Sequence, residues 1–179
     1  GPVSTADHQF LGRSDQDLKL FVLELRSGTL METINTGISY AFGGSMINAT
    51  DDVDKYDYQD DVFYVPYVKR AGTDPDYTWT DGGVVRVNTH GDLDPGNWLS
   101  SKLIDGIGPV TSATSRLHDP RKSQHWVFFG TGRYYFEQEP ADDPEGANRI
   151  FGVKDPCFTG PGTFFTSPCP DPLTSADLE

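Results

Sequence analysis

Short runs of apolar and aromatic residues that favour β-strands recur along the chain between turn residues. Three pairs of runs, each separated by a turn or loop, predict hairpins: 18–25 with 30–34, 62–68 with 83–87, and 125–132 with 149–153. No segment sustains an apolar period of 3.6 residues, the mark of a helix. Residues 94–104 can hold one helical turn after Pro95, and we interpret them as a loop that packs Trp98.

The predicted strands recur at a nearly constant interval along the chain. Equivalent positions lie about 63 to 66 residues apart, as in Phe21 to Val84, Val62 to Trp126 and Val84 to Ile150. A fixed period with paired strands indicates a repeat architecture, and we favour the blades of a β-propeller. The alternative is a β-sandwich of similar length, whose turn signals at short intervals do not account for the long period.

Two further runs in which small residues dominate, 38–47 and 108–117, suit the crowded strands near a propeller axis. The predicted fold class is therefore all-β, with about two and a half to three blades of a larger β-propeller. Residues 1–157 are expected to form this partial propeller, and the Pro/Gly-rich tail 158–179 to start the next segment. Because a closed ring takes at least about four blades, either the remainder of the same propeller or another polypeptide is expected to complete it.

The composition agrees with many short strands, since the chain holds 19 Gly, 13 Pro and 36% hydrophobic residues. A formal net charge of -13, with 14 scattered Lys and Arg, argues against a nucleic-acid partner, because binding to phosphates needs clustered cations. No run approaches the roughly 18 apolar residues that span a bilayer, so no membrane span is expected. The N-terminus shows no leader pattern, and an export signal is expected to lie outside this chain.

Two cysteines, Cys157 and Cys169, lie in Pro/Gly-rich sequence near the C-terminal end. A disulfide between them would close a short loop and stabilise a region that has few apolar residues. The alternatives are two unpaired thiols or a zinc site, and the zinc site lacks further ligands nearby.

Five strings of residues stand in a distinctive order along the chain: DVFYVPY at 61–67, WTDGGVVRV at 79–87, GPVTS at 108–112, FFGTGRYYF at 128–136 and FGVKDPC at 151–157. Together they resemble the C-terminal propeller domain of the PilY1/PilC family of type IV pilus proteins. The resemblance covers roughly residues 1 to 157.

The resemblance implies a non-enzymatic protein that is exported through the periplasm to the cell surface or the pilus tip. There it would support pilus assembly against retraction and act as an adhesin. Its implied partners are pilin, minor pilins and host or surface ligands. The resemblance also implies a calcium-binding loop between blades that modulates pilus extension and retraction.

In the family, that loop commonly reads Asp-x-Asp-x-Asp with a further Asp four residues on. Here Asp52, Asp54 and Asp60 match, but Tyr56 stands at the fifth position and can offer its main-chain carbonyl. These four residues are the expected Ca²⁺ ligands, because calcium takes six to eight oxygens and relieves the repulsion between packed carboxylates. Asp57 or Asp61 can instead supply the missing carboxylate through a shifted loop. The alternative is a solvated acidic loop that keeps an edge strand from pairing with other chains.

No catalytic residue is expected. The four histidines have no spacing that marks a metal site or a general base, and no Gly-x-Ser-x-Gly string is present. Two alternative functions remain open. One is a quinoprotein-like propeller enzyme, although the adjacent cysteines and repeated Trp motifs of such enzymes are missing. The other is a structural partner of a different extracellular filament.

Overall fold

The computed structural model describes residues 13–53, 57–133, 148–160, 169 and 172–178. In these residues the chain forms ten β-strands and two single turns of 3₁₀ helix, and it contains no α-helix. The strands make three antiparallel sheets, which we call the N-terminal, central and C-terminal sheets. The prediction of an all-β fold is confirmed.

The N-terminal sheet is the hairpin of β1 (Lys19–Leu23) and β2 (Leu30–Asn35), as the sequence pattern predicts. Its turn is held by the carboxylate of Glu24, which accepts hydrogen bonds from the main-chain N–H groups of Arg26 and Ser27. One face of the hairpin packs on the central sheet.

The central sheet has the order β3-β5-β6-β7, with β4 (Thr50–Asp51) also pairing with β5. The other strands are β3 (Ala41–Gly43), β5 (Val62–Thr73), β6 (Asp76–Asn88) and β7 (Leu99–Asp105). The predicted pairing of the second hairpin is confirmed. Both of its strands run further than predicted, so only a turn at Asp74-Pro75 remains between the runs 62–68 and 83–87.

Strand β7 corrects the interpretation of 94–104 as a loop. A 3₁₀ turn, η1 (Pro95–Asn97), comes first, and the chain then pairs with β6 along the length of β7. The first half of the strand contains the polar run Ser100-Ser-Lys102, which is not typical of a strand. Leu103 and Ile104, which follow, are fully buried. The expected packing of Trp98 is confirmed, since its ring lies edge-on to Phe63 with the centroids 6.0 Å apart.

The C-terminal sheet has the order β10-β9-β8 and contains the third predicted hairpin. Its strands are β8 (Ser115–Asp119), β9 (Gln124–Gly130) and β10 (Ile150–Lys154). Most of the segment between its two predicted runs, residues 134–147, lies outside the described residues. The run 108–117 becomes regular strand only from Ser115, although Val110 forms an isolated parallel bridge with Gly132.

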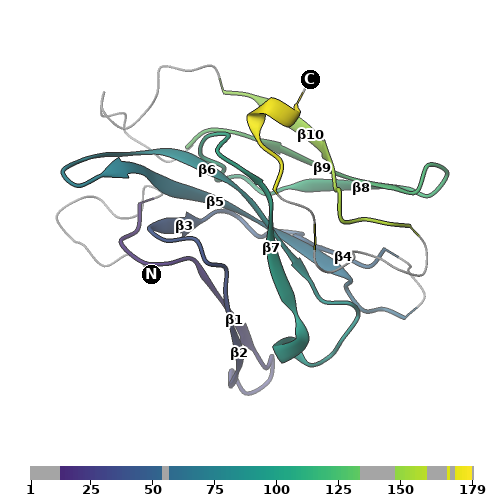
Figure 1. Ribbon diagram of the computed structural model, residues 1–179. Helices are drawn as coiled ribbons and strands as arrows, with labels where there is room; N and C mark the ends of the chain where they lie inside the picture. The colour runs from purple at the N-terminus through teal and green to yellow at the C-terminus, as the bar shows by residue number, and fades with distance from the viewer. Residues whose placement is uncertain (1–12, 54–56, 134–147, 161–168, 170–171, 179) are drawn as a thin grey trace.

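The three sheets pack face to face, with the central sheet in the middle (Figure 1). Alternate residues of β5 serve the two faces, because side chains along a strand point to opposite sides. Val62 and Tyr64 join the core against the C-terminal sheet, whereas Phe63 and Val65 join the core against the N-terminal hairpin. The central sheet is therefore covered on both faces.

Glycines in β6 allow the strands of the central sheet to approach closely. A Cβ on Gly82 would collide with the carbonyl oxygen of Tyr67, and a Cβ on Gly83 with that of Ile104. Both contacts are with main chain, which cannot move aside easily. Gly82 and Gly83 are therefore needed for the close approach of β5 and β7 to β6.

The described part of the tail also belongs to this packing. Leu173 forms a parallel bridge with Ile104 of β7, and its side chain packs against the core beneath the C-terminal sheet, as does Leu178. The division of the chain at residue 157 stays a prediction. Among the described residues, no helix is long and apolar enough to cross a membrane.

Candidate functional site

The acidic loop predicted to bind calcium connects β4 to β5. Asp52 follows β4 and is partly buried, while Asp60 stands exposed shortly before β5. Asp54 and Tyr56, the other two predicted ligands, lie outside the described residues. The predicted set of four therefore stays a prediction.

Asp61 closes the base of this loop. Its side chain is only 5% exposed, and its Oδ2 accepts a hydrogen bond of 2.8 Å from the main-chain N–H of Val53. Its own N–H donates to the carbonyl oxygen of Asp51, and its carbonyl oxygen accepts from the N–H of Thr89. The hydroxyl of Thr89 donates to the carbonyl oxygen of Asp60. The two ends of the loop are thus fixed to each other and to the end of β6.

Two carboxylates of the loop face the same point beside Gly91. A Cβ built on Gly91 would lie 3.6 Å from Oδ2 of Asp57 and 4.0 Å from Oδ1 of Asp61. Within the described ranges, no group of three or more His, Cys, Asp or Glu residues stands close enough to hold a metal ion. Two carboxylates near one point offer fewer oxygens than the six to eight that calcium takes.

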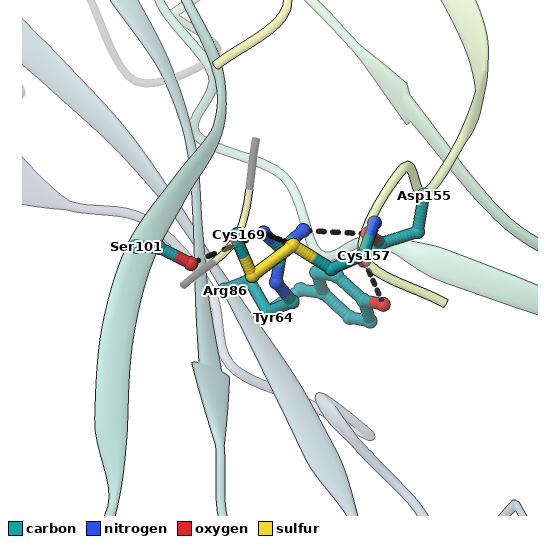
Figure 2. Close-up of a disulfide and its surroundings, with 6 residues drawn as sticks. All are labelled: Tyr64, Arg86, Ser101, Asp155, Cys157 and Cys169. Carbon is teal, nitrogen blue, oxygen red and sulfur yellow. Dashed lines mark hydrogen bonds and ion pairs between the residues drawn. A yellow bond between two sulfur atoms is a disulfide. The ribbon is translucent and has the colours of Figure 1, made fainter. Parts of the chain in front are cut away.

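A buried ion pair joins the central sheet to the C-terminal sheet (Figure 2). Arg86 of β6 and Asp155, just after β10, are both fully buried, and Nη1 of Arg86 lies 2.6 Å from Oδ1 of Asp155. Oδ2 of Asp155 accepts a hydrogen bond of 2.7 Å from the hydroxyl of Tyr64 on β5. The main-chain N–H of Cys157 also donates a hydrogen bond to Oδ1 of Asp155. Nη2 of Arg86 donates a hydrogen bond to the hydroxyl oxygen of Ser101.

Burial dominates the acid–base behaviour of this cluster. It raises the pKa of Asp155, and the Arg86 charge and the hydrogen bond from Tyr64 oppose the rise. It also raises the pKa of the Tyr64 hydroxyl well above its usual value, with the Asp155 charge adding to the effect. Tyr64 is therefore a hydrogen-bond donor at any physiological pH, and the cluster is suited to holding two sheets together.

The disulfide predicted between Cys157 and Cys169 is confirmed, with the two Cα atoms 5.3 Å apart (Figure 2). Nη2 of Arg86 lies 2.7 Å from the sulfur of Cys157. The disulfide ties the tail to the buried ion pair, so both features stabilise one place in the fold.

His125 connects the acidic loop to the same interface. It is fully buried on β9, its ring stacks on that of Tyr64 at a centroid distance of 5.9 Å, and Nε2 lies 3.6 Å from Oδ2 of Asp51. Burial lowers the pKa of His125 to about 4, and the nearby charges of His118 and Arg116 act in the same direction. The imidazole is thus neutral at pH 7.

The spacing of the histidines in the sequence gives no hint of this arrangement. His118 and His125 meet only because β8 and β9 pair in register, which sets them directly opposite each other. The ion pair of Arg86 was not predictable from the sequence either. Arg86 stands within a run of valines, which indicates a buried strand but not the partner of the arginine. The acidic loop was visible because its charge is continuous in sequence.

Neither a protein-family profile, a curated protein nor a solved structure matches this chain. The resemblance to the PilY1/PilC family therefore depends on the five strings of residues and their order.

Proposed function

We propose that the chain is a β-propeller segment of an exported surface protein of the PilY1/PilC type, which acts at the tip of a type IV pilus by binding and mechanical support without catalysis. In this proposal pilin and minor pilins are its partners, and host or surface ligands meet its exposed loops. The observation that carries the proposal is the position of the five strings that resemble the family.

The described residues of the five strings come together at the interface between the central and C-terminal sheets. Tyr64, Arg86 and Asp155 belong to three of them and form the buried cluster. The remaining two strings meet where the N–H of Gly132 donates to the carbonyl oxygen of Pro109, at 2.7 Å. Strings that are far apart in sequence but share one interface are expected if they specify one architecture.

The order of the strands also supports the proposal. The central sheet holds a four-stranded antiparallel path, β3-β5-β6-β7, the number of strands in a propeller blade. In the C-terminal sheet, β8-β9-β10 repeats its first three strands, and the hairpin β1-β2 corresponds to its last two. The residues that lie about 63 to 66 positions apart in the sequence belong to the pairs β1 and β6, β5 and β9, and β6 and β10.

The outer faces of the two outer sheets are apolar as well. Phe21 on β1 is 63% exposed and Ile150 on β10 is 89% exposed. On β9, the rings of Trp126 and Phe128 stack on the face opposite the core. Such faces suit a further blade on either side, and the remainder of the propeller is the proposed occupant.

Calcium binding by the acidic loop is part of the proposal. We expect calcium titrated into chelator-treated protein to release or absorb heat and to raise the melting temperature, because a ligand of the folded state stabilises it. The Asp52→Ala and Asp60→Ala variants should weaken binding about tenfold or more. Asp76→Ala, at the far end of the β5–β6 hairpin, is the matched control. Unchanged affinity in both loop variants would contradict the assignment.

The pilus role is tested by deleting the protein in the cells that make it. Surface pili should disappear and should return when the retraction motor is also inactivated, since the proposed role is support against retraction. An unchanged number of pili in the single deletion would contradict the proposal. An absorbance scan separates the quinoprotein alternative, because a bound quinone absorbs beyond the aromatic band.

A further inference from the structure

A groove of about 370 Å³ opens beside the acidic loop, at the end of the β5–β6 hairpin opposite its turn. Its walls include Met46, Tyr58, Asp60, Phe63, Asp92 and Trp98. They come from the β3–β4, β4–β5 and β6–β7 connections and from the start of β5. The fold brings these separate segments together.

The base of the groove is rigid and aromatic. Phe63 is only 8% exposed and belongs to the core against the N-terminal hairpin, and its ring meets the edge of Trp98. The indole N–H of Trp98 donates a hydrogen bond of 2.8 Å to the carbonyl oxygen of Asp92, which fixes the ring. By contrast, the Tyr58 side chain at the rim is 93% exposed. The groove thus offers fixed aromatic surface and an open entrance.

The charge of the groove is negative. Asp60 and Asp92 line it, and among the described residues no Lys, Arg or His does. The carboxylate of Asp92 accepts hydrogen bonds of 2.8 Å from the N–H of Asp94 and from the side-chain amide of Asn97. The hydrogen bond from Asp94 lowers the pKa of Asp92, so this residue is an anion at neutral pH.

We propose that this groove binds the side chain of an arginine presented by a basic segment of a partner protein. The methylene stem would pack on Phe63 and Trp98, and the guanidinium would donate to Asp60 and Asp92. Arginine suits the site better than lysine because its planar group stacks on aromatic rings while its N–H groups reach carboxylates. The net charge of -13 would attract a basic partner at long range.

The chain already holds one of its own arginines in this way. The guanidinium carbon of Arg70 lies 3.6 Å from the ring centroid of Tyr40 and 4.7 Å from that of Tyr77. Nη1 of the same group lies 3.3 Å from Oδ2 of Asp74. The groove offers the same combination of aromatic rings and carboxylate without an arginine from its own lining. Because Asp60 is also a proposed calcium ligand, the inference applies to the calcium-free protein and is tested in the presence of a chelator.

The test follows the indole N–H resonance of Trp98 in a nitrogen-15 spectrum of the full chain, assigned with the Trp98→Phe variant. The probes are the blocked peptides Gly-Arg-Gly and Gly-citrulline-Gly, which differ in charge but hardly in shape. Titration with the arginine peptide should shift this resonance in a saturable way, while the citrulline peptide should leave it in place. The resonances of Trp79 and Trp126, away from the groove, serve as internal references.

Charge-removing variants locate the site. Asp60→Asn and Asp92→Asn should each weaken binding of the arginine peptide by about fivefold, the effect of losing one partly exposed charged hydrogen bond. Asp76→Asn, exposed at the opposite end of the hairpin, should change affinity less than about twofold. Equal shifts with both peptides, no shift with either, or equal affinity in all three variants would overturn the proposal.

Discussion

His125 of β9 is a titratable side chain that the fold removes completely from solvent. It lies fully buried beside Tyr64 and Phe158, with Asp51, Arg116 and His118 around it. Because burial lowers its pKa to about 4, the folded chain does not take up the proton that an unfolded histidine binds below about pH 6.5. The folded state therefore loses stability as the pH falls from about 6.5 to 4.

We predict that replacing this histidine with phenylalanine removes that loss. The native chain should lose about 3 kcal/mol of unfolding free energy between pH 6.5 and 4 relative to the His125→Phe variant. Phenylalanine keeps the aromatic packing and cannot take up a proton. Urea unfolding at a series of pH values measures the difference.

The control is His90→Asn, since His90 is exposed and has a positive φ of 55° that asparagine tolerates. This variant should follow the pH dependence of the native chain. If His125→Phe also follows it, the buried histidine does not have the proposed effect.

The strands show how far a sequence pattern can specify a fold. All three hairpins were predictable because their runs of strand-forming residues are bounded by turn residues. Val62 and Phe63 are buried on opposite faces of the central sheet, so β5 is apolar on both faces. Strand β7 was not predictable, since its polar first half is paired by main-chain hydrogen bonds that do not depend on its side chains. Nor was the ion pair between β6 and the end of β10, because sequence does not show which strands will pack across an interface.

That ion pair provides a prediction about the contact between two sheets. Arg86→Met should destabilise the fold by about 3 to 5 kcal/mol, because Asp155 would remain buried without its cation. Asp155→Asn should have a similar effect. The double variant should be less destabilised than the sum of the two by about 1 kcal/mol or more, which denaturant unfolding of all four proteins measures.

Arg70 and Asp74 provide the comparison. They form an ion pair of 3.3 Å, but the Asp74 side chain is 72% exposed. Arg70→Met and Asp74→Asn should therefore combine additively to within about 0.5 kcal/mol. Additive effects at Arg86 and Asp155 as well would mean that the buried pair does not couple the two sheets.

The arrangement of the three sheets goes beyond what periodicity alone can establish. The interval of about 63 to 66 residues predicts repeated strands, and the structure shows three antiparallel sheets that pack face to face. The acidic loop was recognised from its charge, but its closure through Asp61 and Thr89 depends on where β6 ends. Two of the four predicted ligands, Asp54 and Tyr56, lie outside the described residues. The calcium titration therefore tests whether this loop binds the ion.

Thiol labelling tests whether the chain is a segment of a larger propeller. Cysteine is placed at Phe21 on the N-terminal sheet and at Ile150 on the C-terminal sheet, both exposed in the chain by itself. Cysteine at the exposed Asp76 is the control, and Cys157 and Cys169 are already joined in the disulfide. If further blades cover the outer faces, Phe21→Cys and Ile150→Cys should react at least about tenfold more slowly in the assembled protein on cells than in the purified chain. Asp76→Cys should react equally fast in both. Equal reactivity of all three positions in the assembled protein and in the purified chain would contradict the propeller.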